Sequence, residues 1–226
     1  MHKAVNVLNM LQERHPELLI LGQSGQGNPY TIFRLGFNEL DESALSVSLK
    51  DQLGPQEDEI VYLVNMRGID IVSPSAAKAL VKGAVEIVKQ RNVPVVFTEV
   101  SRDALQGLQT VNNIRHFEKV MWAVEVDGRP NFVGTVPDRF KRILALLEEK
   151  GGASASELAE ADGGESSKRI VNRFSVYLQE LYDAGLVIRE KVLGSNRTDG
   201  EHGERGERGW TYTYRPAYSV INSLSS

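Results

Sequence analysis

The feature that most constrains the fold is an alternation of strand-like and helix-like patterns between residues 59 and 125. Residues 60–64 and 93–97 are short apolar runs of the kind that form buried strands. Between them, 75–91 repeats apolar residues at helical spacing, namely Ala76, Leu80, Ala84, Ile87 and Val88. A strand, a helix and a strand in succession predict a right-handed parallel crossover. A helix over 102–111 and a strand over 120–124 extend it, so we expect a small α/β domain.

The start of the first of these helices has residues that favour helix initiation. Ser73 is suited to cap the helix, and Pro74 occupies the favoured first-turn position. Over about 58–125, the order of strand, polar loop and helix resembles that of STAS domains, the sulfate-transporter and anti-sigma-antagonist family. The resemblance rests on 61–64 and on 69–76 with the helix that follows.

The resemblance also implies a regulatory loop. In STAS domains a serine at the start of this helix can be phosphorylated to control the docking of a partner. In this chain Pro74 stands at the acceptor position and Ser73 and Ser75 flank it. Ser73 and Ser75 are therefore the candidate regulatory residues, with a plain helix cap as the alternative. An added phosphate would be tolerated at a helix N-terminus because the helix dipole favours negative charge there.

The N-terminal residues predict a short amphipathic helix over 3–14 and two strands, 18–21 and 30–35. A glycine-rich joint, 22–28, links the strands. Gly22 and Gly27 have the spacing of a phosphate-binding loop, but the lysine that such a loop requires is missing. We interpret the joint as a hairpin turn, since glycine readily adopts positive φ. The alternative is a small-ligand site that depends on Gly25 and Gly27.

The second half predicts three helices followed by a hairpin. The helices are expected over 137–150, 153–161 and 166–184, and the alternating runs 186–192 and 210–216 are antiparallel strands. The glycines at 151–152 and Gly185 mark helix ends. Over about 136–217 this order resembles winged helix-turn-helix transcription regulators. The run 178–187 is similar to the exit of their recognition helix into the first wing strand.

The resemblance makes the start of the third helix the candidate DNA-reading surface. In helix-turn-helix docking the N-terminal part of the recognition helix enters the major groove. Lys168 lies above Asn172 on the helix surface because the two are four residues apart, and Arg169 lies above Arg173 in the same way. The expected DNA contacts are Ser166, Ser167, Lys168, Arg169, Asn172 and Arg173 on the helix, with Arg197, Arg205 and Arg208 on the loop between the strands.

Composition narrows the function classes. The 26 basic and 30 acidic residues leave a net charge of −4, which diagnoses no partner. Cysteine is absent, so thiol catalysis and thiolate metal sites are excluded. The chain contains no apolar run long enough for a membrane span and no secretory signal pattern. The four histidines are scattered, and no nucleophile motif is present. We therefore expect a cytoplasmic protein without catalytic residues, cofactor or metal.

The combined hypothesis is α/β plus α+β. It comprises a STAS-like α/β domain over 1–130 with an N-terminal helix and hairpin, a winged-helix domain over 136–217 and a C-terminal tail over 218–226. The expected function is transcriptional regulation as a homodimer on double-stranded DNA, with the STAS-like domain binding a partner, sensing or assembling. The first helix and the tail are candidate dimer elements. The alternative is a signalling scaffold of a partner-switching pathway that binds proteins and no DNA.

Overall fold

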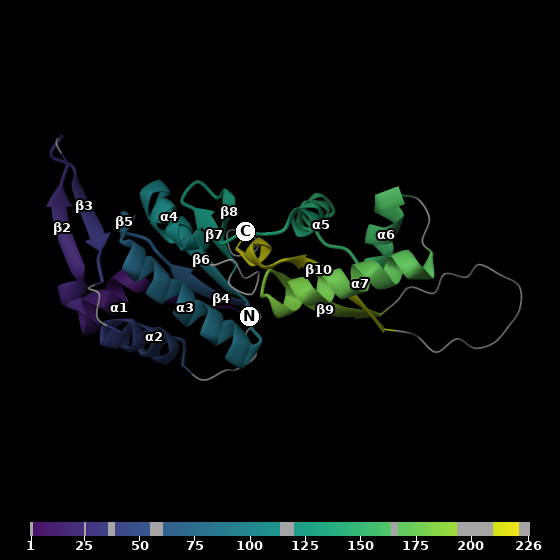
Figure 1. Ribbon diagram of the computed structural model, residues 1–226, viewed down its shortest axis with the longest axis horizontal. Helices are drawn as coiled ribbons and strands as arrows, with labels where there is room; N and C mark the ends of the chain where they lie inside the picture. Colours follow the sequence, from purple (N-terminus) through teal and green to yellow (C-terminus); the bar gives the residue numbers. More distant parts are fainter. Residues whose placement is uncertain are drawn as a thin grey trace, which may run out of the picture. The chain divides into compact units, whose positions relative to one another are not determined.

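The computed structural model describes residues 2–24, 26–35, 39–54, 61–113, 120–163, 167–193 and 210–221. These residues form a mixed α/β protein with three sheets (Figure 1). The chain divides into two compact units. The first unit contains three segments, Met1–Pro137, Asp183–Leu186 and Ala217–Ser226, and the second contains Asp138–Tyr182 and Val187–Pro216.

A five-stranded sheet organises the first unit. Its strands are β1 (His2–Asn6), β4 (Val61–Asn65), β6 (Val95–Val100), β7 (Met121–Glu125) and β8 (Pro130–Val133), in the order β1-β4-β6-β7-β8. The first four are parallel, and β8 pairs with β7 in the antiparallel sense. The helices of this unit are α1 (Val7–Arg14), α2 (Glu39–Leu53), α3 (Pro74–Arg91) and α4 (Arg102–Gln109). The alternation along 59–125 is therefore a parallel α/β arrangement, as the sequence predicts.

The main core contains side chains of these helices and the strand side chains on one face of the five-stranded sheet. Tyr62 and Phe97 on the strands and Leu80 on α3 are fully buried members of this core. Side chains point to alternate faces along a strand, so Leu63, Val96 and Trp122 belong to the other set, and they are buried as well. The sheet is therefore covered on both faces, which parallel sheets generally require.

The second set is covered by residues from near the C-terminus. The 3-10 helix η4 (Ala217–Val220) contacts β6 and β7, and the ring of Tyr218 meets that of Trp122 edge-on at 4.5 Å between centroids. The indole Nε1 of Trp122 donates a 2.8 Å hydrogen bond to the carbonyl of Leu186, which also accepts one from the backbone N–H of Ala217. Two segments distant in sequence therefore complete the α/β unit.

A smaller sheet of three strands also belongs to the first unit. The strands β2 (Leu19–Gln23) and β3 (Pro29–Phe33) form an antiparallel hairpin, and β3 pairs in parallel with the two-residue strand β5 (Ile71–Val72). The short 3-10 helix η1 (Pro16–Leu18) leads into β2. This pairing brings the hairpin to the loop that precedes α3.

The second unit consists of three helices and a two-stranded sheet. The helices are α5 (Asp138–Glu149), α6 (Ala155–Gly163) and α7 (Lys168–Asp183), and the strands β9 (Val187–Leu193) and β10 (Trp210–Pro216) pair antiparallel. Ala153 adds an isolated antiparallel bridge, because its backbone exchanges two 2.9 Å hydrogen bonds with Tyr214 of β10. The helix and strand predictions for 137–216 are thus confirmed to within a few residues at the ends.

Helix starts follow the capping chemistry of the sequence. The Ser73 hydroxyl accepts a hydrogen bond from the backbone N–H of Ala76, and Pro74 is the first residue of α3. Ser154 and Glu157 form a reciprocal capping box at the start of α6, in which the Glu157 carboxylate accepts a 2.6 Å bond from the backbone N–H of Ser154. These bonds satisfy backbone donors that have no partner within the helix.

The prediction of a helix over 3–14 is wrong for its first half. Residues His2–Asn6 form β1, which pairs with β4, and the helix begins only at Val7. Asn6 caps it through a 2.9 Å hydrogen bond from the backbone N–H of Asn9. Helical spacing of Val5 and Leu8 is compatible with both outcomes. Pairing with a neighbouring strand decides the conformation of so short a segment.

Three further segments differ from the sequence interpretation. The helix α2 and the strand β8 were not expected, and β8 follows a turn at Asp127–Gly128 that closes a hairpin with β7. In the tail, a candidate dimer element, the described residues Tyr218 and Val220 are buried in the first unit. The side chains of α1 at Val7 and Leu11 are buried in the same way. No helix among the described residues combines the length and the apolar character that a membrane span needs.

Candidate nucleic-acid interface

Helix α7 has one apolar face and one polar face. Phe174, Leu178 and Leu181 are buried, at the three- and four-residue spacing of a helix that packs along one side. Lys168, Arg169 and Asn172 are exposed on the remaining surface. The amphipathic pattern that buries the first set therefore directs the second set to solvent.

Most of the side chains predicted to contact DNA from the helix have no hydrogen-bond or ion-pair partner among the described residues. Within the described residues, the side chains of Ser167, Lys168, Arg169 and Asn172 form no hydrogen bond or ion pair with the rest of the protein. Ser166 of the same set, and Arg197, Arg205 and Arg208 of the predicted loop contacts, lie outside the described residues. An exposed cation or amide without an internal partner retains its full hydrogen-bonding capacity for a ligand.

Arg173 differs from its neighbours because it is paired. Its guanidinium lies 3.2 Å from the Asp162 carboxylate near the end of α6, and the guanidinium of Arg142 lies 2.6 Å from the other oxygen of the same carboxylate. Half of the Arg173 side chain is exposed, whereas one fifth of Asp162 is. Arg173, a predicted DNA contact, is thus exposed, but Asp162 neutralises part of its charge.

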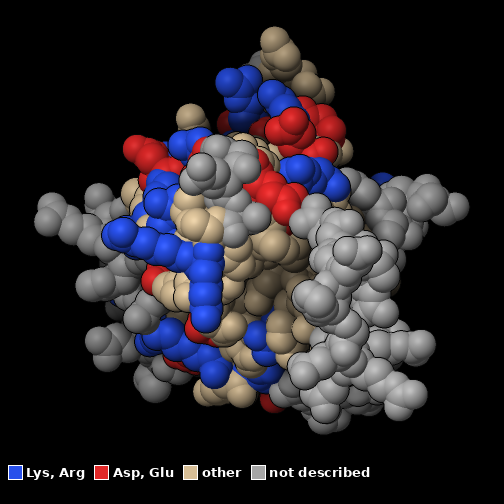
Figure 2. Space-filling view, turned by 90° about the vertical axis from the view of Figure 1, so that its right-hand side faces the viewer, with Lys and Arg blue, Asp and Glu red and all other residues tan. Residues whose placement is uncertain are grey.

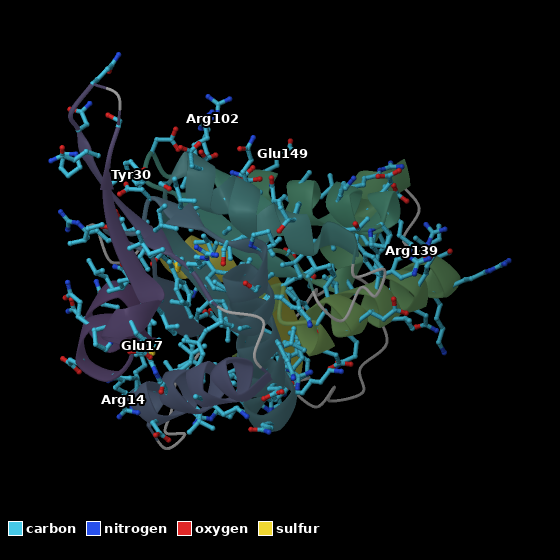
Figure 3. All side chains as sticks on the ribbon, turned by 60° about the vertical axis from the view of Figure 1, so that its left-hand side comes forward. Arg14, Glu17, Tyr30, Arg102, Arg139 and Glu149 are labelled. Carbon is cyan, nitrogen blue, oxygen red and sulfur yellow. The ribbon has the colours of Figure 1, made fainter. Side chains whose placement is uncertain are left out.

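These charges surround a hollow of about 210 Å³ between α5, α6 and α7. Its base is apolar, and its rim carries Arg139, Arg142 and Arg173 together with Asp162. Arg139, labelled in Figure 3, lies over the ring of Phe140 with its guanidinium carbon 4.6 Å from the centroid, and it is 3.8 Å from Glu180. Figure 2 faces the end of the second unit that carries α6 and the start of α7, where basic and acidic side chains lie above and to the left of an uncharged recess.

The hairpin β9–β10 carries a second cluster of cations, interleaved with aromatic rings. Tyr212 pairs with Lys191 in the register of the hairpin, and Tyr214 pairs with Arg189. Lys191 Nζ lies 4.6 Å from the ring centroid of Trp210. The guanidinium of Arg189 lies 4.8 Å from the ring of Tyr212, and 4.1 Å from that of Tyr182. We name Arg189, Lys191, Trp210 and Tyr212 the cation–aromatic face of the hairpin.

A groove of about 240 Å³ separates part of this face from α7. Trp210, Tyr212 and Tyr214 line it from β10, and Val171 and Ser175 line it from α7. The start of α6 closes it at Ala155 and Ser156. An exposed helix surface and an exposed strand surface thus meet in one concave region of the second unit.

In the first unit, the two candidate regulatory serines are held by internal hydrogen bonds. The Ser75 hydroxyl donates a 2.7 Å bond to the carbonyl of Leu35, and the Ser73 hydroxyl accepts a bond from the backbone N–H of Leu35 as well as the capping bond from Ala76. Both side chains are partly buried. The hydroxyls thus tie β3 and the residues after it to the start of α3, and phosphorylation would have to break these bonds.

The glycine-rich joint is the turn of the β2–β3 hairpin. Gly27 has φ +79°, and Gly22 pairs across the hairpin with Tyr30. The ring of Tyr30, labelled in Figure 3, lies so close over Gly22 that a Cβ at this position would be 2.5 Å from it. Gly25 lies outside the described residues. The ring of Tyr30 thus packs over Gly22, and a larger residue at this position would displace that ring.

No group of three or more metal-ligating side chains occurs in the parts of the chain that the structure describes. The pKa of Glu157 is lowered because its carboxylate accepts hydrogen bonds from the backbone and the hydroxyl of Ser154. The pKa of Glu86 on α3 is lowered mainly by its 2.8 Å hydrogen bond from Lys50 of α2. These carboxylates are engaged in capping a helix and in joining two helices.

Sequence reasoning missed several residues that the fold brings to these surfaces. Asp162 lies just beyond the helix expected over 153–161 and was not singled out, although it pairs with arginines of two other helices. The cation–aromatic face was interpreted only as a pair of wing strands. The sequence did contain an indication of this face. Cations occupy alternate positions of β9 and aromatic residues occupy alternate positions of β10, and alternate residues of a strand share a face.

No protein family model matches this chain, and neither a curated protein nor a solved structure matches it. What the second unit can bind is therefore argued from its own geometry.

Proposed function

We propose that the second unit is a winged helix-turn-helix module that binds double-stranded DNA, and that the chain is a cytoplasmic transcriptional regulator. The element order supports this proposal: α5, the bridging residue Ala153, α6, α7 and then the hairpin β9–β10. In this assignment α7 is the recognition helix and the hairpin is the wing.

The observation that carries the proposal is the exposed, internally unpaired row at the start of α7. Lys168, Arg169 and Asn172 occupy the first two turns of the helix, opposite the buried residues. The N-terminal part of a recognition helix is the part that contacts base edges. Arginine and lysine bind guanine or phosphate, and asparagine binds adenine, so this set suits a mixed sequence in the major groove.

For the first unit we propose partner binding or assembly. Its order β4, β5, α3, β6, α4 supports the resemblance to STAS domains. The internal hydrogen bonds of Ser73 and Ser75 favour helix capping over phosphorylation. A homodimer would present two copies of α7 to two half-sites, and the operator would then be palindromic.

The test begins with selection of bound fragments from a random duplex library at moderate salt. An enriched palindrome is the expected result, because a symmetric dimer reads a symmetric site. Affinity for that site is then measured by fluorescence anisotropy as a function of salt. We expect Arg169→Ala to weaken binding, and if the lost contact is to a phosphate, the slope of log K against log salt falls by about 0.9.

Arg102→Ala is the matched control. Arg102 is also an exposed arginine in the first turn of a helix, α4, but belongs to the first unit (Figure 3). Loss of binding in Arg169→Ala with retention in Arg102→Ala supports α7 as the reader. Equal affinity of Arg169→Ala, Lys168→Ala and the unmodified protein refutes it. Failure to enrich any fragment, with a protein partner still captured, favours the signalling scaffold.

A further inference from the structure

The hairpin offers a binding chemistry that reading of duplex DNA does not require. We propose that the cation–aromatic face, with the groove beside it, binds unpaired nucleobases of a single-stranded nucleic acid by stacking on Trp210 and Tyr212. This inference concerns a different ligand from the duplex proposed for α7, and its test is independent of that proposal.

The first observation is the exposure of the two rings. Trp210 is 58% exposed and Tyr212 is 43% exposed, whereas Tyr214 on the same strand is buried. The rings of Tyr212 and Tyr214 lie 6.5 Å apart, so the aromatic row runs from the core of the unit out to solvent. Large exposed aromatic surface is costly unless a ligand covers it, and every base has a π-face that can do so.

The second observation is the position of the cations. Lys191 lies over one face of Trp210 at 4.6 Å, and Arg189, which also donates a 3.1 Å hydrogen bond to Gln179, lies over one face of Tyr212 at 4.8 Å, so a base would stack on the other face of each ring. A base that stacks on a ring carries its phosphate a few ångströms away, where a lysine or an arginine is the preferred partner. Aromatic rings with interleaved cations are the combination that binds single strands without sequence preference.

The third observation is the lining of the groove. Ser156 at the start of α6, Ser175 on α7 and Thr211 on β10 also line the groove, and the Ser156 hydroxyl shares a 3.0 Å hydrogen bond with that of Ser154. A hydroxyl can both donate and accept, so it can meet the edge of any base. Among the described residues that line the groove there is no aspartate or glutamate. The groove thus suits a flat polar heterocycle attached to an anionic backbone.

The experiment uses the full chain and three probes: oligo-dT, oligo-rU, and oligo-dT annealed to oligo-dA. The chain has two tryptophans, and because Trp122 is buried, quenching of fluorescence by a stacked base reports on Trp210. We expect saturable quenching by oligo-dT and oligo-rU. The duplex should quench less, because its bases are already stacked. A difference between oligo-dT and oligo-rU identifies the preferred sugar.

Affinity of the variants is measured by anisotropy of labelled oligonucleotides. Trp210→Leu should weaken binding of oligo-dT about fivefold or more, since loss of one stacking ring costs roughly 1–3 kcal/mol. Trp210→Phe retains a ring and should restore most of the affinity. Arg169→Ala serves as the control for the α7 surface and should bind oligo-dT normally.

The outcomes separate this inference from the proposed function. Weak oligo-dT binding in Trp210→Leu with normal duplex binding supports the stacking site alone. Normal oligo-dT binding in both Trp210→Leu and Tyr212→Leu overturns it, whatever α7 does with the duplex. Absence of quenching by either single strand at concentrations that saturate the anisotropy signal also overturns it.

Discussion

The two tryptophans lie in contrasting regions of this protein. Trp122 in the first unit is 4% exposed, and its ring contacts Phe132 and Tyr218 while its Nε1 donates to a backbone carbonyl. Trp210 in the second unit is 58% exposed, and its described neighbour is the Lys191 ammonium group. Both are aromatic residues on strands, yet one closes a core and the other faces solvent.

The same contrast holds for polar groups at helix starts. In the first unit the Ser73 hydroxyl accepts a hydrogen bond from the backbone N–H of Leu35, and the Ser101 hydroxyl donates one to the carbonyl of Asp70, so both tie their helices to other segments. At the start of α7, by contrast, Lys168 and Arg169 have no side-chain partner within the described residues. Groups whose bonding capacity is used internally stabilise a fold, and groups whose capacity is unused are available to a ligand. The serines at these helix starts of the first unit therefore stabilise its fold, whereas the cations at the start of α7 keep their bonding capacity within the described structure.

The largest expected effect is the stability difference between two tryptophan variants. Trp122→Ala removes a buried ring and should cost roughly 3–5 kcal/mol of unfolding free energy. Trp210→Ala removes an exposed ring and should change stability by no more than about 0.5 kcal/mol. Urea unfolding followed by circular dichroism measures both. Similar losses in the two variants would remove the contrast between the regions.

A smaller effect concerns the segment near the C-terminus. If η4 belongs to the core of the first unit, Trp122 and Tyr218 should be energetically coupled. A double-mutant cycle with Trp122→Phe and Tyr218→Leu should give a coupling energy of about 0.5–1.5 kcal/mol, as measured for aromatic pairs. The matched pair Trp122→Phe with Tyr30→Leu should be additive, because Tyr30 packs in the β2–β3 hairpin. Additive effects in the first cycle would contradict the inclusion of η4 in this core.

The capping box of α6 should give a pH-dependent effect of about 1 kcal/mol. Glu157→Gln removes the carboxylate that accepts two hydrogen bonds from Ser154. Since these bonds lower the pKa of Glu157 in the folded state, its contribution is complete above the ordinary glutamate pKa and is lost as pH falls through the lowered value. The stability difference between the unmodified protein and the variant should therefore be largest near neutral pH and shrink on acidification. A constant difference across this range would contradict the assignment.

The smallest effect tests the competition at Arg173. Asp162→Asn removes the carboxylate that pairs with Arg173 and Arg142, so both guanidiniums become available to phosphates. We expect duplex affinity to rise by up to about fivefold, because an exposed pair is worth roughly 0.2–1 kcal/mol. Asp138→Asn, which breaks the 3.0 Å pair with Lys141, controls for the change in net charge. Equal gains in both variants would point to net charge and not to Arg173.

Local patterns predicted much of the second unit and of the central α/β region. Capping at Ser73 and Ser154 was visible because a cap and its partner lie three residues apart. The helix α2 and the strand β1 were not predicted. The helix α2 packs on α3 through contacts between residues distant in sequence, and β1 depends on pairing with β4. Within the candidate interface, the exposed residues of α7 were predictable from amphipathic spacing, but the pairing of Arg173 with Asp162 was not.

The sequence alone determined which segments are helices and strands wherever hydrophobic period, caps and glycine stops agree within a few residues. It also determined the chemistry that α7 exposes, because burial of its apolar stripe turns the cations outward. Only the tertiary structure decided that Leu186 and Tyr218 cover the sheet of the first unit, that one carboxylate pairs with two arginines, and that strand cations lie over aromatic rings. These outcomes depend on contacts between residues far apart in the chain, which short-range periodicity does not encode.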